Sequence, residues 1–337
     1  MRAVVMHRPA PIEDGALRVE EVDRPVPGPG QVLVRVTACG VCRSNIHMIE
    51  GDWMDAGVPT KLPIIPGHEV VGTVAEVGEG VTDLREGDRI GVQPLWSTCG
   101  RCRYCLSGLD HLCQAKEITG ETLDGGYAEY MLATAAHAHR LPDELDDAEA
   151  APLFCPGITA YGSVAKAGLG PARRAAVFGV GGVGHMVIQF AALTGADVIA
   201  VSRGAEHLEL AREVGATETI DASDGDPGEV LAEQGGVDAS IVFAPSDAAV
   251  AQAIRGTRPG GVVVIGVNAR VGSLPFADEK MVVGSLLGTR RQMREVLEIA
   301  AAGKVRARCE QHPLEQAEEA LQRLKDGKIR ARAVLVV

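Results

Sequence analysis

The chain has 337 residues, enough for two domains that each bury a core of their own. Its formal net charge of −12 argues against nucleic acid or an anionic membrane as the main partner. No apolar run is long enough to span a bilayer, and the amino terminus lacks the pattern of a secretory signal. We therefore expect a cytoplasmic protein without membrane contact, whose cysteines bind metal rather than form disulfides.

The first part of the chain predicts short β-strands. Apolar and β-branched residues cluster at 1–6, 17–22, 31–38, 70–77 and 89–92, and proline and glycine fill 25–30. No long helical pattern separates these clusters, so they indicate a compact β-rich domain.

Three segments of this part offer ligands for a transition metal. Residues 39–47 contain two thiols and an imidazole, and further His and Cys stand at His68 and Cys155. Cys42, His68 and Cys155 are the ligand types of an open catalytic zinc site, with a fourth position left for water or substrate. Taken alone, each residue is better explained as a buried core position, so the zinc interpretation depends on the other motifs.

A second cysteine group has the spacing C-x2-C-x2-C-x7-C. It consists of Cys99, Cys102, Cys105 and Cys113. Four thiolates this close can form a closed tetrahedral zinc shell, which is structural rather than catalytic. Redox chemistry is the weaker alternative, since one C-x2-C pair would suffice. His111 is not needed as a ligand, and Cys39 and Cys309 are expected to be ordinary buried residues.

The pattern changes near residue 175. A short apolar strand at 175–178 leads into Gly179, Gly181, Gly182 and Gly184, and a helical pattern follows at 183–194. Strand, glycine loop and helix together indicate dinucleotide binding, because the glycines allow a tight turn and close approach of the pyrophosphate to the helix end.

Strands and helices then alternate. Strands are expected at 197–201, 238–243, 262–267 and 281–287, with helices at 208–214 and 247–255. This is the pattern of a doubly wound parallel sheet, and the fold class is α/β. Helices at 292–302 and 316–324 and a strand at 333–337 return to the β-rich part. The expected domains are 1–156 with 288–337, including a cysteine lobe at 97–115, and 157–287.

With these motifs in this order, the chain resembles the zinc-dependent alcohol dehydrogenases of the medium-chain dehydrogenase/reductase superfamily. The resemblance implies a GroES-like catalytic domain, a Rossmann domain and a substrate cleft between them. It implies that Cys42, His68 and Cys155 hold a catalytic zinc beside Glu69, while the four-cysteine group holds a second, structural zinc. It also implies a homo-oligomer, either a tetramer or a dimer.

The resemblance also assigns roles to single residues. Ser44 and His47 match a relay that carries the alcohol proton towards solvent. Arg43 and Arg332 match contacts to cofactor phosphates, and Thr159 matches a neighbour of the nicotinamide. For Arg43, Arg332 and His47, the residues alone would instead favour a solvated surface.

The implied activity is reversible hydride transfer between a small alcohol and NAD(P), with zinc lowering the pKa of the bound alcohol. The main alternative is another zinc-dependent reductase such as a polyol or sugar dehydrogenase, which would be expected to carry Glu in place of Cys155. A zinc-free quinone reductase would lack the thiolates. A non-enzymatic dinucleotide-binding protein would be expected to lose Ser44, His68 or Cys155.

Asn45 departs from the pattern of the related enzymes, which usually carry Asp there. We expect its amide oxygen to accept a hydrogen bond from the His68 ring and the missing charge to make the zinc more electropositive. A neutral variation is the alternative. Trp53 and Trp96 are expected either to border the substrate cleft or to pack in the core.

The end of the second Rossmann strand bears on the cofactor. NAD-binding folds usually place Asp or Glu there, whereas this chain has Ser202-Arg203. A hydroxyl and a guanidinium can bind a 2′-phosphate, which a carboxylate would repel. NADP is therefore favoured, and NAD remains possible because Glu206 could reach a ribose.

Overall fold

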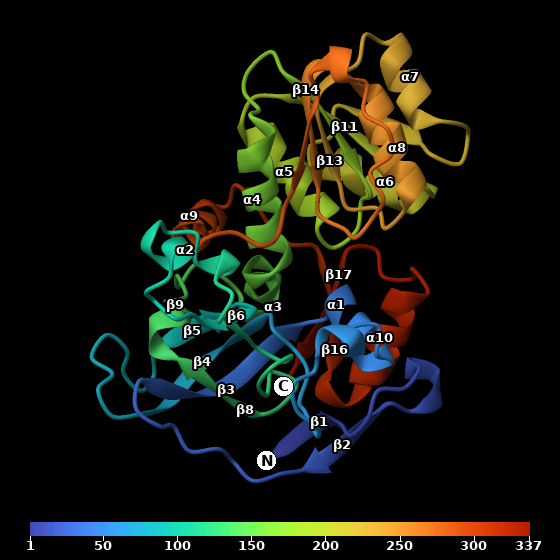
Figure 1. Ribbon diagram of the computed structural model, residues 1–337. Coiled ribbons are helices and arrows are strands. Elements are labelled where there is room, and N and C mark those ends of the chain that lie inside the picture. The colour runs from blue at the N-terminus through green and yellow to red at the C-terminus, as the bar shows by residue number, and fades with distance from the viewer. The chain divides into compact units, whose positions relative to one another are not determined.

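The computed structural model describes residues 1–337, and the chain divides into two compact units (Figure 1). The first comprises Met1–Cys155, Thr289–Ala301 and Ala307–Val337, and the second comprises Pro156–Gly288 and Ala302–Arg306. The sequence analysis placed the junctions after residues 156 and 287, and that assignment of domains stays a prediction. The second unit thus interrupts the first along the chain.

A seven-stranded sheet organises the first unit. Its strand order is β16-β17-β3-β4-β5-β9, and β8 also pairs with β3. The strands are β3 (Gln31–Gly40), β4 (Val70–Val77), β5 (Arg89–Val92), β8 (Tyr130–Thr134), β9 (Ala138–Arg140), β16 (Cys309–Pro313) and β17 (Arg332–Val336). Two small sheets pair β1 (Arg2–Met6) with β2 (Leu17–Glu21) and β6 (Leu95–Ser97) with β7 (Glu117–Ile118).

β3 is the central strand of this sheet. It is ten residues long, and its β-branched side chains are largely buried. One part of β3 pairs with β8, its far end pairs with β17, and β4 runs antiparallel beside it. Strand β17 comes from the far end of the chain, so the sheet joins segments that are distant in sequence.

Short helices surround this sheet. They are α1 (Arg43–Glu50), α2 (Arg103–Leu106), α3 (Asp147–Ala150), α9 (Arg290–Ala301) and α10 (Ala317–Lys325). Helix α1 packs against α10 and buries Ile46 and Ile49. The sequence analysis did not predict α1, because it is only eight residues long and mostly polar on its exposed face. It ends at Gly51, which has a φ of 86° that favours glycine.

The second unit is built on a six-stranded parallel sheet. The strands are β10 (Arg174–Phe178), β11 (Asp197–Ser202), β12 (Glu218–Asp221), β13 (Val237–Val242), β14 (Thr257–Ile265) and β15 (Met281–Gly284). Across the sheet the strands lie in the order β12-β11-β10-β13-β14-β15. From β10 the chain first adds strands on one side, as β11 and β12, and then returns to add β13, β14 and β15 on the other. The predicted doubly wound sheet is confirmed, and such a reversal is where ligands bind in these folds.

Helices cover both faces of the parallel sheet. They are α4 (Pro156–Ala167), α5 (Gly184–Leu193), α6 (Ala205–Glu213), α7 (Pro227–Glu233) and α8 (Asp247–Gly256). Figure 1 shows α4 and α5 on one side of the strands and α7 and α8 on the other. Of these elements, α4, α7 and β12 were not predicted, because their sequences are short or rich in glycine and charged residues. No helix in the structure has the length and apolarity required to cross a membrane.

Candidate active site

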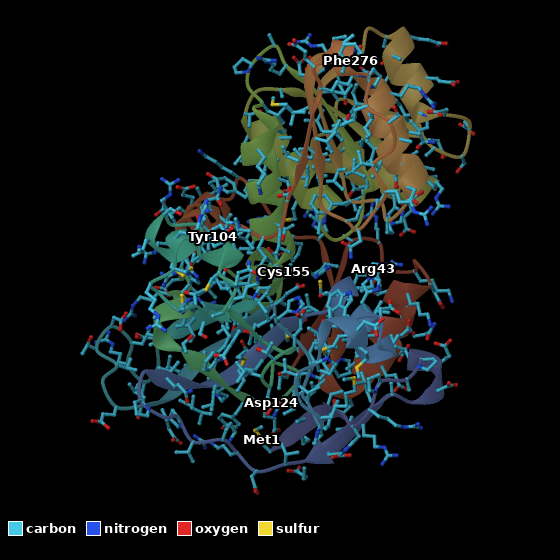
Figure 2. The ribbon with its side chains drawn as sticks, in the orientation of Figure 1. Met1, Arg43, Tyr104, Asp124, Cys155 and Phe276 are labelled. Carbon is cyan, nitrogen blue, oxygen red and sulfur yellow. The ribbon has the colours of Figure 1, made fainter.

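Two thiols, an imidazole and a carboxylate meet in the first unit. Cys42, His68, Glu69 and Cys155 each place a ligand atom within 4.8 Å of the others, and Figure 2 labels Cys155. The Sγ atoms of Cys42 and Cys155 are 3.9 Å apart. Two thiolates on one tetrahedral zinc ion, with bonds near 2.3 Å, would lie roughly 3.8 Å apart. The donor set and its spacing therefore fit zinc.

Local structure explains why these three segments meet. β3 pairs with β4, so Cys42 just beyond the end of β3 and His68 just before β4 lie at the same end of the two strands. Cys155 follows α3 and a short 3-10 helix that ends at Phe154, which is fully buried. Asp146 caps α3 by accepting hydrogen bonds from the backbone N–H groups of the next turn at 3.0 and 3.1 Å.

Glu69 is fully buried beside this cluster and has a buried cation as its partner. The Nε of Arg332 donates to its carboxylate at 3.1 Å, and a second guanidinium nitrogen donates to the other oxygen. Arg332 is only 4% exposed. Gly40 makes room for this carboxylate, because a Cβ there would lie 1.9 Å from a Glu69 oxygen.

This pairing changes the interpretation of Arg332. The sequence analysis expected a contact to a cofactor phosphate, or else a solvated side chain. The solvated alternative is wrong, since Arg332 is buried and donates twice to Glu69. The structure assigns the guanidinium to charge compensation within the site, and the phosphate contact stays a prediction.

Ser44 and His47 lie on α1, next to the ligand cluster. The hydroxyl of Ser44 is 3.4 Å from the Nε2 of His68. His47 is half-buried, its Nδ1 is 2.7 Å from the carboxylate of Asp52, and its ring stacks on Trp53 at 5.7 Å. Arg43, the first residue of α1, is exposed and is labelled in Figure 2.

Asn45 does not form the expected hydrogen bond with His68. Its Oδ1 instead accepts hydrogen bonds from the backbone N–H of Cys42 at 3.3 Å and from the hydroxyl of Tyr127 at 3.2 Å. The main chain of the helix start and a buried phenol therefore orient this amide. The Nδ1 of His68 is buried without a hydrogen-bond partner.

The sequence analysis missed Glu121 in this site. One of its carboxylate oxygens lies 3.9 Å from the Nδ1 of His68, and its side chain is 15% exposed. Burial raises the pKa of Glu121, while the neighbouring His68 opposes that shift. Glu121 lies in a loop after the cysteine group and belongs to no motif, so no local signal could have identified it.

The four-cysteine group also assembles in the first unit. Neighbouring Sγ atoms are 3.5 to 4.0 Å apart, again close to the spacing on a tetrahedral zinc ion. Backbone N–H groups of residues 101 and 102 lower the pKa of the Cys99 thiol to about 6, which favours the thiolate that binds metal. His111 is buried nearby but does not belong to the group.

The two leftover cysteines differ slightly. Cys39 is fully buried, as expected. Cys309 is half-buried on β16, and burial raises the pKa of its thiol to about 12, so it too stays neutral.

The predicted dinucleotide residues lie in the second unit. Gly179 follows β10 with a φ of 96°, and a Cβ on Gly184, the first residue of α5, would lie 1.8 Å from the carbonyl oxygen of Gly179. A Cβ on Gly181 would meet no atom within 4 Å, which leaves the loop backbone open to a ligand. These features fit the pyrophosphate loop described for such folds.

The remaining cofactor candidates of the second unit lie at the end of β11 and on α4. Ser202 ends β11, and Arg203 is exposed with a guanidinium that forms no ion pair. Thr159 is half-buried on α4, and its carbonyl oxygen accepts a hydrogen bond from Ser163 at 2.7 Å.

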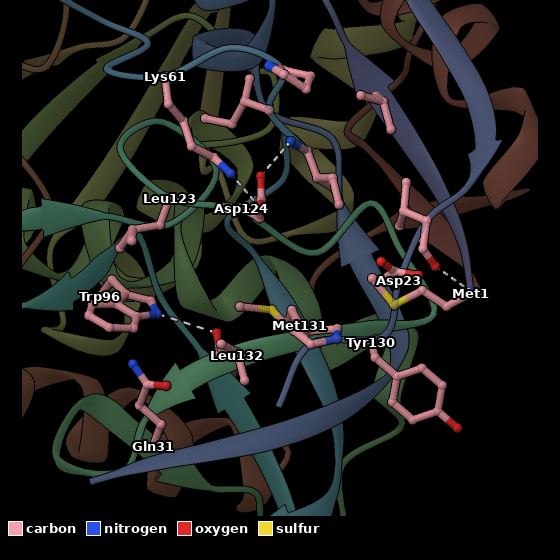
Figure 3. A pocket seen from close by; sticks show the side chains of 16 residues that line it. Met1, Asp23, Gln31, Lys61, Trp96, Leu123, Asp124, Tyr130, Met131 and Leu132 are labelled. Carbon is pink, nitrogen blue, oxygen red and sulfur yellow. Dashed lines mark hydrogen bonds and ion pairs between the residues drawn. The ribbon is translucent and has the colours of Figure 1, made fainter. Parts of the chain in front are cut away.

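Trp96 borders a different cavity. A hollow of about 330 Å³ in the first unit is lined mainly by apolar side chains (Figure 3). Its lining includes Lys61 and Asp124, which form an ion pair of 2.6 Å. The indole of Trp96 forms part of its wall and donates to the carbonyl oxygen of Leu132 at 3.3 Å. None of the predicted zinc ligands lines this hollow. Trp53, in contrast, stacks on a predicted site residue, His47.

Comparisons with known proteins agree with this geometry. The family described as "Alcohol dehydrogenase GroES-like domain" matches residues 28–143, and "Zinc-binding dehydrogenase" matches residues 182–302. An alcohol dehydrogenase of Geobacillus stearothermophilus is 42% identical over 327 residues, which cover 95% of this chain and 96% of the relative.

Solved structures show the same likeness over the whole chain. The alcohol dehydrogenase of Aeropyrum pernix has a TM-score of 0.91 and 34% identity, covering 100% of both chains. A chain of Sinorhizobium meliloti, solved bound to NADP, has a TM-score of 0.89 and 30% identity, covering 100% of this chain and 99% of that one.

We predict two zinc ions of different character. Replacing Cys102 by Ser should impair folding, because a structural zinc contributes folding free energy directly. Replacing Cys155 by Ser should leave the fold intact but abolish turnover. Elemental analysis should find two zinc ions per wild-type chain and one in Cys155→Ser. Cys309→Ser, outside both groups, is the control and should keep both ions; one zinc per fully active wild-type chain would contradict the prediction.

A second prediction concerns the buried ion pair. Arg332→Met leaves the Glu69 carboxylate buried without a cation, so the free energy of unfolding of the first unit should fall by about 3–5 kcal/mol. Both tryptophans lie in this unit, so their fluorescence during urea unfolding measures it selectively. The double variant Arg332→Met/Glu69→Gln should recover part of the loss. A loss below about 1 kcal/mol, the usual range of an exposed pair, would contradict the prediction.

Proposed function

The chain belongs to the zinc-dependent alcohol dehydrogenases of the medium-chain dehydrogenase/reductase superfamily, and on that premise we propose that Cys42, His68 and Cys155 carry its catalytic zinc and that NADP is its preferred cofactor. The observation that carries the proposal is the convergence of these three ligands beside the Ser44 hydroxyl. The protein is an oxidoreductase that interconverts alcohols with aldehydes or ketones.

These three residues would hold zinc, which would supply a Lewis acid for the substrate oxygen and so lower the pKa of an alcohol. The protein must also keep the fourth coordination position of the zinc free of protein ligands. Glu69 belongs to the same cluster, but its two oxygens accept from Arg332 and are thereby held in that ion pair. The ion pair thus leaves room for a substrate oxygen.

Ser44 and His47 handle the proton in this proposal. The Ser44 hydroxyl is close enough to the ligand cluster to accept the proton of an alcohol bound there and pass it on. His47 is half-buried, and its Nδ1 can donate to Asp52, which leaves Nε2 as the acceptor for the relayed proton. Asp52 is exposed, so this path ends at solvent.

A nicotinamide cofactor held by the second unit would supply the hydride chemistry. In our proposal the loop from Gly179 to Gly184 receives the pyrophosphate at the start of α5. Thr159 contacts the nicotinamide, and Arg43 and Arg332 contact phosphates. Ser202 and the unpaired Arg203 at the end of β11 receive the 2′-phosphate of NADP. Among similar solved structures, one is bound to NADP and others are NAD-dependent or bound to NAD, so the choice of NADP rests on Ser202 and Arg203, and Glu206 keeps NAD as the second candidate.

We predict that the zinc-loaded protein oxidises simple alcohols. A panel of primary, secondary and aromatic alcohols, each with NADP⁺ and NAD⁺, is followed by formation of the reduced nicotinamide. Ser44→Ala should lower kcat by about 10²- to 10⁴-fold, the usual contribution of positioned acid–base catalysis. Ser97→Ala, which removes a hydroxyl bonded only to Glu117, is the matched control. Wild-type kcat in Ser44→Ala would exclude the relay, and no turnover of any alcohol or carbonyl would exclude the assignment.

We also predict a preference for NADP⁺ over NAD⁺ in kcat/KM. Arg203→Ala should reduce that preference by roughly 10- to 100-fold, the range expected for hydrogen bonds to a charged group. Arg212→Ala, an exposed arginine on the following helix α6, removes the same charge and should change nothing. A wild type that favours NAD⁺, or a ratio that Arg203→Ala leaves unmoved, would show that Arg203 does not bind the 2′-phosphate.

A further inference from the structure

We propose that Glu121 is the residue that positions His68, by accepting a hydrogen bond from the Nδ1–H of its ring when Nε2 binds the metal. This inference rests on the proposed function of Cys42, His68 and Cys155 as a zinc site. It transfers to Glu121 the role that the sequence analysis had expected of Asn45.

The orientation of the His68 ring identifies which nitrogen faces the metal. Its Nε2 lies 3.4 Å from the hydroxyl of Ser44 and 3.9 Å from the carboxylate of Glu69, which belongs to the ligand cluster. Nε2 therefore points to the cluster. Nδ1 points away from it, is buried, and has no hydrogen-bond partner.

A ligand histidine needs a partner for this second nitrogen. Metal-bound imidazoles almost always donate the other ring N–H to a carboxylate, a carbonyl or water, which fixes the tautomer and makes the ring a stronger ligand. A group with this chemistry lies close to Nδ1, because a Glu121 carboxylate oxygen is 3.9 Å away. A side-chain rotation that shortens this distance by about 1 Å would bring it to hydrogen-bond length.

Glu121 is available for this contact. Its side chain is 15% exposed, and its carboxylate accepts no hydrogen bond from any other residue. Its backbone, in contrast, is anchored, since its N–H donates to the carbonyl of Ile118 and its own carbonyl accepts from Thr60, each at 3.2 Å. The backbone of Glu121 is therefore fixed, and its mostly buried carboxylate faces a ring nitrogen that also lacks a partner. These are the properties expected of a residue that positions a ligand histidine.

Asn45 cannot serve in its place. Its Oδ1 already accepts from the Cys42 N–H and the Tyr127 hydroxyl, and its Nδ2 is a donor, which cannot accept a proton from an imidazole. The carboxylate near the metal is therefore supplied from the loop after the cysteine group rather than from α1. In this proposal Glu121 supplies the negative charge that Asn45 lacks. Asn45 therefore does not make the zinc more electropositive.

The test measures the zinc affinity of the catalytic site by competition with a chelator, with the four-cysteine site as internal reference. Glu121→Leu should weaken zinc binding by about 10- to 100-fold, the usual cost of losing such a partner. Glu121→Gln retains an acceptor without charge and should lose less. Glu117→Gln removes the same charge from an exposed position nearby and should match the wild type.

A rescue variant and substitution of zinc by cobalt distinguish a loss of His68 positioning from a general loss of folding. Asn45→Asp in the Glu121→Leu background replaces the Nδ2 donor by a carboxylate oxygen that can accept from the ring, and should restore affinity in part. With Co²⁺ at the site, Glu121→Leu should shift the visible absorption band, and Glu117→Gln should not. Glu121→Gln keeps nearly the same volume, so its result stands even if Glu121→Leu folds poorly.

Three outcomes would overturn the inference. The first is a Glu121→Leu affinity within twofold of the wild type. The second is a higher KM for the alcohol with unchanged zinc affinity, which would mean that Glu121 contacts the substrate instead. In both cases the wild type still binds zinc, so the proposed function survives. The third is a wild type that binds no metal at Cys42, His68 and Cys155, which would exclude both the inference and the proposed function.

Discussion

The first unit depends on one buried ion pair, between Glu69 and Arg332. Glu69 has no contact with water and Arg332 has almost none, and a buried charge without a partner costs several kcal/mol. The two residues are 263 positions apart, so their attraction ties β17 to the segment that carries His68. The same pair holds the Glu69 carboxylate, so that three ligands rather than four remain in the zinc site that we propose.

Much of this arrangement could be predicted because the chemistry is local. The strands at 70–77 and 89–92 have the predicted bounds, and the two ligand groups assemble from the predicted cysteines and His68. Metal-ligand spacing and a glycine loop between strand and helix are patterns that a few neighbouring residues determine. The elements that were missed, such as α1 and β12, are short and are stabilised by packing against distant segments.

The polar contacts around His68 could not be predicted for the same reason. Asn45 stands where a partner of the ring was expected, but the start of α1 and Tyr127 hold its oxygen elsewhere. Glu121 comes from a loop more than fifty residues after His68 and carries no motif. Which polar group reaches a ring nitrogen depends on how separate segments pack, and one sequence does not contain that information.

The interruption of the first unit by the second has a consequence for biosynthesis. On the ribosome, domains tend to fold as their residues emerge. Nearly all of the dinucleotide unit is contiguous, so it can complete its sheet while α10 and β17 are still being made. The metal-binding segments are synthesised first, yet their buried carboxylate acquires its counter-charge only when Arg332 emerges. The half that is translated earliest is thus the last to reach its finished form.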